Sequence, residues 1–380
     1  MNNTLASMLT LVNHIIIPPL TWKFNKLGRR FFSSLAEQYL AGHSLEQGLE
    51  TIIALYEDGT PHDKLSGRSS SFDILGEDAK TKDEADEYLG IYKRFIDMIV
   101  AGRESGRIRD QDAVSVSLKP TAIAAVAGDE DLPFIHPETP LVPRLEELVR
   151  YAKERNIKVT LDMEDHKWTE RTLDAAQEIW KCGYDNLGIV LQSRLNRTQH
   201  DILKYITLQS YATPREKIRV RACIGVYREP RSEATNDKKE AKQRLVERIR
   251  ELFAAGIYVE IATHDHDVIY QIIDEIIVPQ GISPARFEFQ FLRGVENAYQ
   301  IDKQLLGQGY KVRYYMPVEL KPEAGIPYMK RRLIQNPEMV VNAAKNIAQR
   351  AKKYASEAVE RRIQRSFRHA TTKYKVNRHF

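Results

Sequence analysis

Two adjacent arginines in the segment YMKRRLIQN, residues 328–336, could bind an anion. On a helix four residues of this segment share one face, because they are spaced i, i+3, i+4 and i+7: Tyr328, Arg331, Arg332 and Gln335. A guanidinium group matches a carboxylate through two parallel hydrogen bonds, so this face could clamp a carboxylate-bearing substrate. A solvated basic face explains the same spacing. The clamp requires a scaffold with an active site that this helix covers.

Two acidic, histidine-containing segments offer a second chemistry, metal binding. Residues 162–166 read DMEDH and residues 263–267 read THDHD, so both supply metal-ligand side chains at close spacing. No third histidine lies near His264 and His266 in the second segment, and no H-E-x-x-H motif is present. His264 is therefore expected to make hydrogen bonds at the end of a strand and His266 to lie in a loop, and no metal is expected.

The same region allows two further chemistries. Asp162 and Glu164 would point to one side of a strand and could act as an acid–base pair, unless Lys119 and Arg221 hold them in ion pairs. Alternatively, polar side chains at strand ends could contact the rings and the diphosphate of an organic cofactor. These residues alone do not decide between the two.

Eight short apolar or β-rich runs alternate with amphipathic stretches along most of the chain. Alternation predicts parallel strands joined by helices, and eight units over roughly 250 residues predict an α/β fold, a (β/α)8 TIM-like barrel. An open doubly wound sheet is the alternative, without a Rossmann site because no G-x-G-x-x-G follows a run. The predicted strands are 71–77, 113–120, 158–164, 186–193, 217–223, 258–264, 286–292 and 311–317. The predicted helices include 82–102, 141–156, 170–183 and 234–256, the last with Thr235 or Asn236 as its N-cap.

Most of the predicted strands end in polar side chains. In a barrel of this kind, function lies at the C-terminal ends of the strands. Charges buried there need partners or ligands, because an unpaired buried charge is costly. The candidate site residues are Glu77, Lys119, Asp162, Glu164, Gln192, Arg221, Thr263, His264, Glu288, Gln290 and Tyr315.

Segments outside the barrel differ from it in composition. Residues 1–66 are predicted to be helical, including 31–42 and 44–59 with Ser44 as an N-cap, and residues 67–337 form the barrel. Residues 338–380 contain eleven Lys or Arg and three Glu, a net charge of +8, which leaves −3 for the other 337 residues. This tail reads as a basic amphipathic helix that packs on the barrel or contacts an anionic membrane surface. Nucleic-acid binding is not expected, because few aromatic residues are interleaved.

The totals are those of a globular protein in a reducing compartment. Hydrophobic residues make up 42% and charged residues 29% of the 380-residue chain. The only cysteines are Cys182 and Cys223, which argues against a secreted, disulfide-linked protein. The N-terminus lacks a basic n-region, and no run reaches the roughly 18–20 apolar residues of a membrane span. A cytoplasmic location is expected.

Nine segments, in order along the chain, resemble the motifs of the proline dehydrogenase family, FAD-dependent enzymes with a distorted (β/α)8 barrel. Each is short, but their order and their place at strand ends make the joint match specific, and Tyr-x-x-Arg-Arg is the most specific element. The segments are DILGE (73–77), VSLKPTAI (116–123), LDMED (161–165), VLQSRLNRT (190–198), RVRACIGVYREP (219–230), ATHD (262–265), FEFQFLRG (287–294), VRYYMPV (312–318) and YMKRRLIQN (328–336).

The resemblance implies oxidation of L-proline, or a related secondary amine amino acid, to the imine by hydride transfer to flavin N5. The electron acceptor would be a quinone, which suits a tail peripheral to the inner face of the membrane. The implied substrate-binding residues are Arg331, Arg332, Tyr315, Tyr328, Leu292 and Lys119. The implied FAD-binding residues are Gln192, Arg221, Gly225, Thr263 and His264. Arg221, Lys119 and Asp162 would be catalytic.

Two departures from the family pattern bear on this expectation. Ile224 stands where the family has a lysine that helps hold the flavin, and Val226 stands where it has alanine. Gln335 stands where the family has a glutamate that pairs with an arginine. These changes leave open a second interpretation, a proline-dehydrogenase-like barrel that binds a small molecule in a non-catalytic or regulatory role.

Overall fold

The chain divides into two compact units, residues 26–329 and a second unit made of residues 1–25 and 330–380. A computed structural model describes residues 37–57, 68–76, 78–128 and 134–321, all of which belong to the first unit. The predicted clamp segment with Tyr328, Arg331, Arg332 and Gln335, the basic tail and Glu77 lie outside the described residues.

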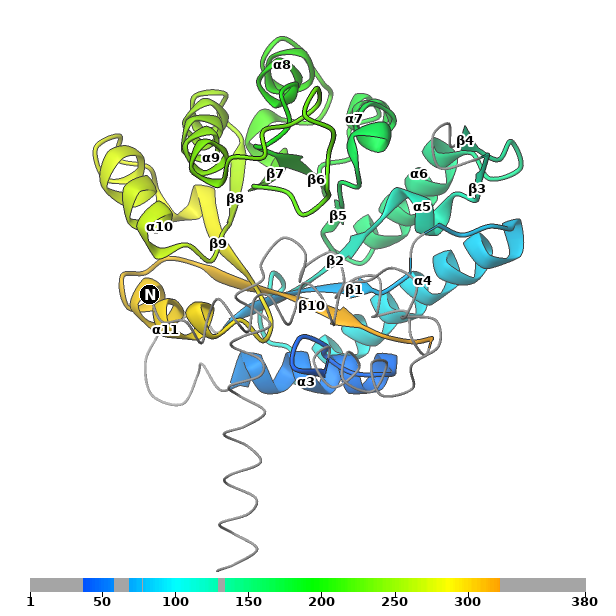
Figure 1. The fold of residues 1–380 in the computed structure, drawn as a ribbon. Helices are drawn as coiled ribbons and strands as arrows, with labels where there is room; N and C mark the ends of the chain where they lie inside the picture. Colours follow the sequence, from blue (N-terminus) through cyan, green and yellow to red (C-terminus); the bar gives the residue numbers. More distant parts are fainter. Residues whose placement is uncertain (1–36, 58–67, 77, 129–133, 322–380) are drawn as a thin grey trace, which may run out of the picture. The chain divides into compact units, whose positions relative to one another are not determined.

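Eight parallel strands close into a barrel in the order β1-β10-β9-β8-β7-β6-β5-β2 (Figure 1). Each strand pairs in parallel with both neighbours, so the predicted barrel is confirmed and an open sheet is excluded. The strands are β1 (Ser69–Ile74), β2 (Val114–Leu118), β5 (Val159–Leu161), β6 (Leu187–Gln192), β7 (Arg219–Cys223), β8 (Tyr258–Ala262), β9 (Phe287–Leu292) and β10 (Val312–Val318). A small antiparallel pair, β3 (Val126–Ala127) and β4 (Phe134–Ile135), lies outside the barrel sheet.

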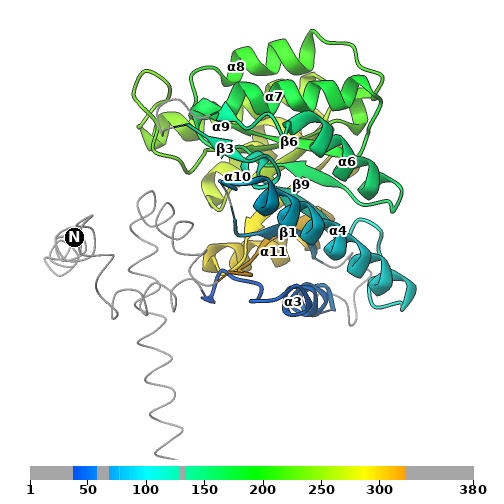
Figure 2. The ribbon, with the colours of Figure 1, turned by 90° about the vertical axis from the view of Figure 1, so that its right-hand side faces the viewer.

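Helices surround the strands, as Figure 2 shows. The first described helix, α3 (Leu45–Glu57), packs beside β10 and β1. The longer helices are α3 (Leu45–Glu57), α4 (Lys82–Glu104), α6 (Leu141–Lys153), α7 (His166–Lys181), α9 (Lys238–Ala254), α10 (His266–Ile272) and α11 (Glu296–Gly307). Short helical turns are α5 (Pro120–Ile123) and α8 (Thr198–Asp201). Among the described residues, no helix has both the length and the hydrophobicity needed to cross a bilayer.

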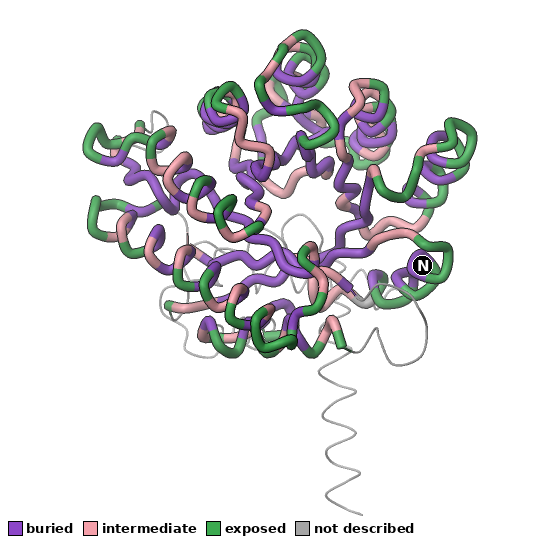
Figure 3. The backbone as a smooth tube through the Cα atoms, turned by 180° about the vertical axis from the view of Figure 1, so that it is seen from behind, coloured by how far each residue is buried: buried purple, intermediate pink, exposed green. Residues whose placement is uncertain are grey.

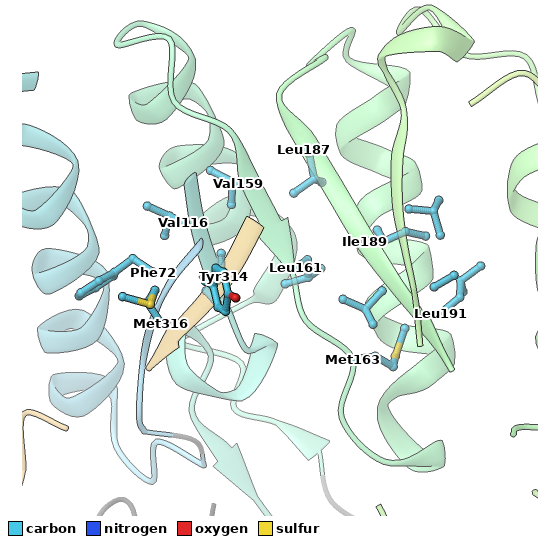
Figure 4. Close-up of a cluster of buried hydrophobic side chains, with 14 of the residues drawn as sticks. Phe72, Val116, Val159, Leu161, Met163, Leu187, Ile189, Leu191, Tyr314 and Met316 are labelled. Carbon is cyan, nitrogen blue, oxygen red and sulfur yellow. The ribbon is translucent and has the colours of Figure 1, made fainter. Parts of the chain in front are cut away.

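The apolar core is the layer between strands and helices. Alternate residues of each strand point outward, where branched and aromatic side chains pack against helices; Phe72 of β1, for example, stacks on Phe95 of α4. Buried residues follow the strands and the inner faces of the helices, while exposed residues follow the outer faces (Figure 3). Figure 4 shows part of this layer, with Phe72, Val116, Val159, Leu161, Met163, Leu187, Ile189, Leu191, Tyr314 and Met316.

Local details differ from the sequence-based expectations at three places. The N-cap of α9 is Asp237, whose side chain accepts bonds from Lys239 N and Glu240 N, rather than Thr235 or Asn236. Residues 38–42 are not helical, because Gly42 extends beside Val318. Strand β1 ends at Ile74 rather than at residue 77. The Ser44 N-cap is confirmed, since its side chain accepts a bond from Gln47 N.

Candidate active site

A charged cluster occupies the C-terminal mouth of the barrel, centred on Arg221 of β7. Its Nη1 atom lies 2.6 Å from Asp162 Oδ1, just after β5, and 3.2 Å from Ser117 Oγ of β2. Tyr315 of β10 donates its hydroxyl to the other oxygen of Asp162 at 2.8 Å, and its ring lies 5.3 Å from the guanidinium carbon. Arg221 is only 6% exposed, so this geometry is fixed by a network in low dielectric.

A second pair, Asp73 and Lys119, completes this mouth cluster. Asp73, near the end of β1, is fully buried, and Lys119 Nζ lies 3.1 Å from its Oδ2 atom. The pKa of Asp73 is raised to about 6, first by burial and also by the negative charge of Asp162, while the positive charge of Lys119 lowers it. The mouth therefore holds two carboxylates and two cations, and one carboxyl group titrates near neutrality.

A different network fills the lower half of the barrel, below the mouth. Arg313 donates to Glu288 Oε1 at 2.6 Å and to Ser70 O at 2.9 Å. Arg219 donates to Glu260 Oε1 at 2.7 Å and to the carbonyl of Val159. We refer to Arg313, Glu288, Arg219 and Glu260 as the floor network.

Gln290 connects the floor network to the mouth cluster. Its side-chain nitrogen donates to Glu260 at 2.8 Å and Glu288 at 2.6 Å, and its oxygen accepts from Arg221 Nε at 2.6 Å. Arg221 is thus held from below by a neutral amide and from the side by a carboxylate. Since both bonds use a rigid fork, the orientation of the guanidinium plane is set before any ligand binds.

One atom of Arg221 is left over. Its Nη2 nitrogen is buried and has no hydrogen-bond partner among the described residues. An unsatisfied donor on a buried guanidinium is costly, so an acceptor from water or from a ligand is expected to meet it. The mouth cluster can therefore offer a fixed positive donor to a ligand that carries or develops negative charge.

The residues expected to contact FAD line three consecutive strands on one side of the mouth. Gln192 ends β6 and donates to Glu164 O, while Gly225 follows β7 with a φ of +104°. A Cβ atom at Gly225 would lie 2.4 Å from Gln192 Oε1, so only glycine fits there. Thr263 and His264 follow β8, and His264 Nε2 accepts a bond from Leu292 N. That bond requires a neutral imidazole, with its proton on Nδ1.

The described residues expected to contact substrate lie on the remaining strands. Lys119 follows β2, Asp162 follows β5, Leu292 ends β9 and Tyr315 belongs to β10. Arg221 stands between the two groups and contacts Asp162 directly. The structure therefore brings Lys119, Asp162, Arg221 and Tyr315 into one cluster and leaves Gln192, Gly225, Thr263 and His264 on its β6–β7–β8 side.

Two alternative chemistries were considered for this region, an acid–base pair and a metal site, and the contacts of the described residues bear on both. Asp162 bonds Arg221 and Tyr315, whereas Glu164 accepts from the amide and hydroxyl of Thr121, so the two carboxylates serve different partners. Lys119 pairs with Asp73, and Arg221 holds Asp162 in an ion pair, which is part of the ion-pair alternative to an acid–base role. His266 bonds Asn297 O from the start of α10. In the part of the chain that the structure describes, no group of three or more His, Cys, Asp or Glu side chains is arranged to hold a metal.

Sequence reasoning missed Asp73, although the signal was present. The run 71–77 was read as a strand ending at Glu77, while β1 ends at Ile74 and places Asp73 at the mouth. It also missed Arg194, which follows β6 and donates to Tyr227 O and Asn236 Oδ1. Only the folded path of the chain after β7 reveals those contacts.

Similarity to known proteins agrees with this geometry. The model of the family described as proline dehydrogenase matches residues 60–345. The chain is 29% identical over 317 residues to a proline dehydrogenase of Deinococcus radiodurans, covering 82% of this chain and 89% of that protein. It is 28% identical over 312 residues to proline dehydrogenase 1 of Bacillus subtilis, covering 82% and 90%.

A solved structure shows the same fold in a larger protein. Proline utilization A of Bdellovibrio bacteriovorus superposes with a TM-score of 0.69 at 23% identity, over 80% of this chain and 33% of that one. The chain thus spans about a third of that protein's length. The closed barrel, its charged mouth and a family match that covers most of the chain lead to one conclusion: the chain belongs to the proline dehydrogenase family of oxidoreductases.

Proposed function

We propose that this protein oxidises L-proline, or a closely related secondary amine amino acid, to the cyclic imine with FAD as its cofactor. From proline the product is Δ1-pyrroline-5-carboxylate. The observation that carries the proposal is the buried Arg221, fixed by Asp162 and Gln290, with a donor nitrogen that no described residue satisfies. The family membership supplies the reaction class.

The residues at the mouth fit such a cofactor. Gln192 and Thr263 have side chains able to form hydrogen bonds, Gly225 makes room for the Gln192 amide beside it, and Arg221 offers Nη2. When bound, FAD supplies an acceptor, at its N5 atom, for the hydride that leaves the carbon next to the substrate nitrogen. A fixed cation at Arg221 favours negative charge in its surroundings, so it would stabilise the product side of this transfer.

The other mouth residues would bind and orient the amino acid. Lys119 could attract the substrate carboxylate, and the family resemblance assigns carboxylate binding through forked hydrogen bonds to Arg331 and Arg332, which lie outside the described residues. Tyr315, with Leu292 and Tyr328, would wall the pocket and exclude water. Asp162 keeps Arg221 in place through its 2.6 Å bond, and Tyr315 shares that carboxylate. Binding by several fixed charges holds the reacting carbon in one orientation.

Anaerobic spectroscopy tests this proposal. The full chain, expressed with riboflavin or reconstituted with FAD, is expected to be yellow and to bleach on addition of L-proline. L-leucine, a primary amine of similar charge, serves as the negative control. Protein that binds no FAD, or bound FAD that L-proline leaves oxidised, would overturn the proposal.

The departures at Ile224 and Gln335 support a second candidate, a small-molecule binding or regulatory protein. Its distinguishing result is a thermal shift with L-proline or another secondary amine acid in protein that binds no flavin. The paired charges of the mouth cluster could hold an amino acid without oxidising it, so this outcome would keep the site and change the activity.

The electron acceptor and the site of action belong to the same proposal. A lipid-borne quinone would reoxidise the flavin, and the +8 charge of residues 338–380 would draw the protein to the inner face of an anionic membrane. Co-sedimentation with vesicles containing anionic phospholipid, compared with a chain ending at residue 337, tests the tail. Equal pelleting of the two forms would end the membrane part of the proposal.

A further inference from the structure

The chain that leaves strand β7 forms a loop, residues 224–236, which leads to α9 and begins beside the expected cofactor position. We call it the β7–α9 loop. It starts with Ile224 and Gly225, directly above Arg221, and ends next to the α9 cap Asp237. How this loop is held decides the shape of the mouth on its β6–β7 side.

A single side chain, Arg194, fastens both ends of the β7–α9 loop. Its Nη1 donates to Tyr227 O at 2.8 Å, near the start of the loop. Its Nη2 donates to Thr235 O at 3.3 Å and to Asn236 Oδ1 at 3.1 Å, at the far end. The backbone of Arg194 adds bonds to Ile224 O and from Thr235 N. One guanidinium thus spans the loop.

Arg194 also lies against the residues expected to meet the cofactor. A Cβ atom at Gly225 would be 3.1 Å from Arg194 Cδ and 2.4 Å from Gln192 Oε1, so the stem of Arg194 and the amide of Gln192 border the same bare stretch of backbone. The arginine is 6% exposed, and burial lowers its pKa. A cation in this position acts on its surroundings with little screening by water.

Within the β7–α9 loop, Arg194 donates to two carbonyl oxygens and one amide oxygen, and the negative charge of Glu229 also acts on it and opposes the lowering of its pKa by burial. The carboxylate of the same loop, Glu229, faces His166 of α7, with 2.5 Å between Oε2 and Nδ1 and a further bond from His166 N. The Arg194 fork near the barrel mouth and the Glu229–His166 pair at α7 thus hold different parts of the loop, and Asn196 adds bonds to Ser232 O and Glu233 O. Of these, only the Arg194 fork brings positive charge beside Gly225.

We propose that Arg194 is a cofactor-positioning residue that holds the β7–α9 loop and presents a positive charge to the anionic groups of FAD beside Gly225. This inference rests on the proposed function. The family resemblance places a lysine at the start of the β7–α9 loop, where this chain has the uncharged Ile224. The proposal instead places the cation on this side of the site at Arg194, which follows β6. An anionic ligand that approaches Gly225 would gain attraction from Arg194 without displacing the loop.

Two substitutions of Arg194 separate its charge from its fork geometry. Arg194→Gln removes the charge but keeps an amide donor, and Arg194→Lys keeps the charge but loses the fork. Apoprotein of the full chain is titrated with FAD, and the midpoint potential of the bound flavin is measured alongside. Arg194→Gln is expected to weaken FAD binding about tenfold or more, and Arg194→Lys by less. If Arg194→Gln lowers the midpoint potential of the flavin, the charge of Arg194 acts near the flavin ring. If the potential is unchanged, the charge acts near the diphosphate.

Two matched controls distinguish this role from simple loop fastening. Glu229→Gln weakens another fastening of the same loop, and Arg244→Gln removes one positive charge from α9 at a side chain that bonds Asn196 Oδ1 and Arg194 O. Both are expected to keep FAD affinity within about twofold of wild type. If either control loses as much affinity as Arg194→Gln, or if Arg194→Gln binds FAD as wild type does, the inference is wrong.

Folding and the proposed function are controlled separately. Thermal melting of each apoprotein shows whether it is folded, and Arg194→Lys carries the test if Arg194→Gln does not fold. In that case, Arg194→Lys is compared with wild type in its affinity for FAD, its flavin midpoint potential and the salt dependence of FAD binding. If all three are unchanged, the fork of Arg194 has no role. If the variant loses affinity for FAD in high salt, the positive charge contributes to binding. Wild-type apoprotein that binds no FAD overturns the proposed function itself, whereas wild-type binding with an unaffected Arg194→Gln overturns only this inference.

Discussion

The floor network and the mouth cluster of the barrel both pair buried arginines with carboxylates, and they differ in the pKa values of their carboxyl groups. In the floor, Arg313 donates hydrogen bonds to Glu288, to the hydroxyl of Ser115, and to the carbonyl oxygens of Ser70 and Asp112. Each network keeps one buried guanidinium nitrogen without a partner among the described residues, Nε of Arg219 in the floor and Nη2 of Arg221 at the mouth. The carboxyl groups of the two networks have different pKa values: the pKa of Glu288 in the floor is lowered to about 2, and that of Asp73 at the mouth is raised to about 6.

This difference indicates that buried ion pairs in one barrel can serve two purposes, stability in the floor and ligand binding at the mouth. A buried pair fixes the fold of the barrel interior, where a lone charge would be prohibitive. At the mouth, Asp73 has a raised pKa and Arg221 keeps a buried Nη2 without a described partner, so a ligand there can supply an acceptor. The largest effects of substitution should therefore fall on stability in the floor and on activity at the mouth.

Breaking the floor should have the largest effect. In Glu288→Gln the buried Arg313 loses its anionic partner, 2.6 Å away, and we expect a loss of about 3–5 kcal/mol in the free energy of unfolding. Urea denaturation of the apoprotein measures it. An exposed ion pair provides the control: Glu50→Gln, which removes the partner of Arg107, should leave the free energy of unfolding nearly unchanged. Equal losses in the two variants would contradict the distinction.

Two arginines on one strand give the sharpest test of the comparison. Arg221→Lys keeps a cation but loses the fork that bonds Asp162 and Gln290, and kcat/KM for L-proline should fall about 10²–10³-fold, or about 2.7–4 kcal/mol. Arg219→Lys, two residues earlier and paired with Glu260, is the matched control. It should lower the melting temperature while the folded enzyme keeps its kcat/KM. The reverse pattern would show that floor and mouth are not functionally distinct.

The fold was accessible from sequence because outward-facing apolar residues alternate with helices in all eight units. The mouth was accessible in part, since Lys119, Asp162, Arg221 and Tyr315 stand at or near strand ends. Partners across the barrel were not, because Arg313 meets Glu288 and Arg219 meets Glu260 only through the stagger of the closed sheet. Asp73 was missed because a strand end misplaced by three residues moves a different carboxylate to the mouth.

The raised pKa of Asp73 predicts a pH dependence of stability. A carboxyl group with a folded pKa of about 6 and an ordinary value of 3.8 favours the folded state fully below 3.8, and this contribution is lost as the pH rises through 6. Asp73→Asn should abolish that loss, which is on the order of 2 kcal/mol. Unfolding free energies at pH 4, 5, 6 and 7, compared between wild type and variant, measure it. Parallel curves for the two proteins would refute the assignment.

The smallest expected effect concerns Tyr315, which joins the two carboxylates and the guanidinium of the mouth. Tyr315→Phe removes the hydroxyl that donates to Asp162 Oδ2 at 2.8 Å but keeps the ring 5.3 Å from the Arg221 guanidinium carbon. The Asp162–Arg221 bond remains, so kcat/KM should fall only about three- to tenfold, consistent with one hydrogen bond of about 1 kcal/mol. Tyr258→Phe is the floor counterpart, since its hydroxyl donates to Glu288 at 3.3 Å, and it should leave kcat/KM unchanged. A loss at Tyr315 as large as that of Arg221→Lys would mean that the hydroxyl touches the substrate itself, rather than acting through Asp162.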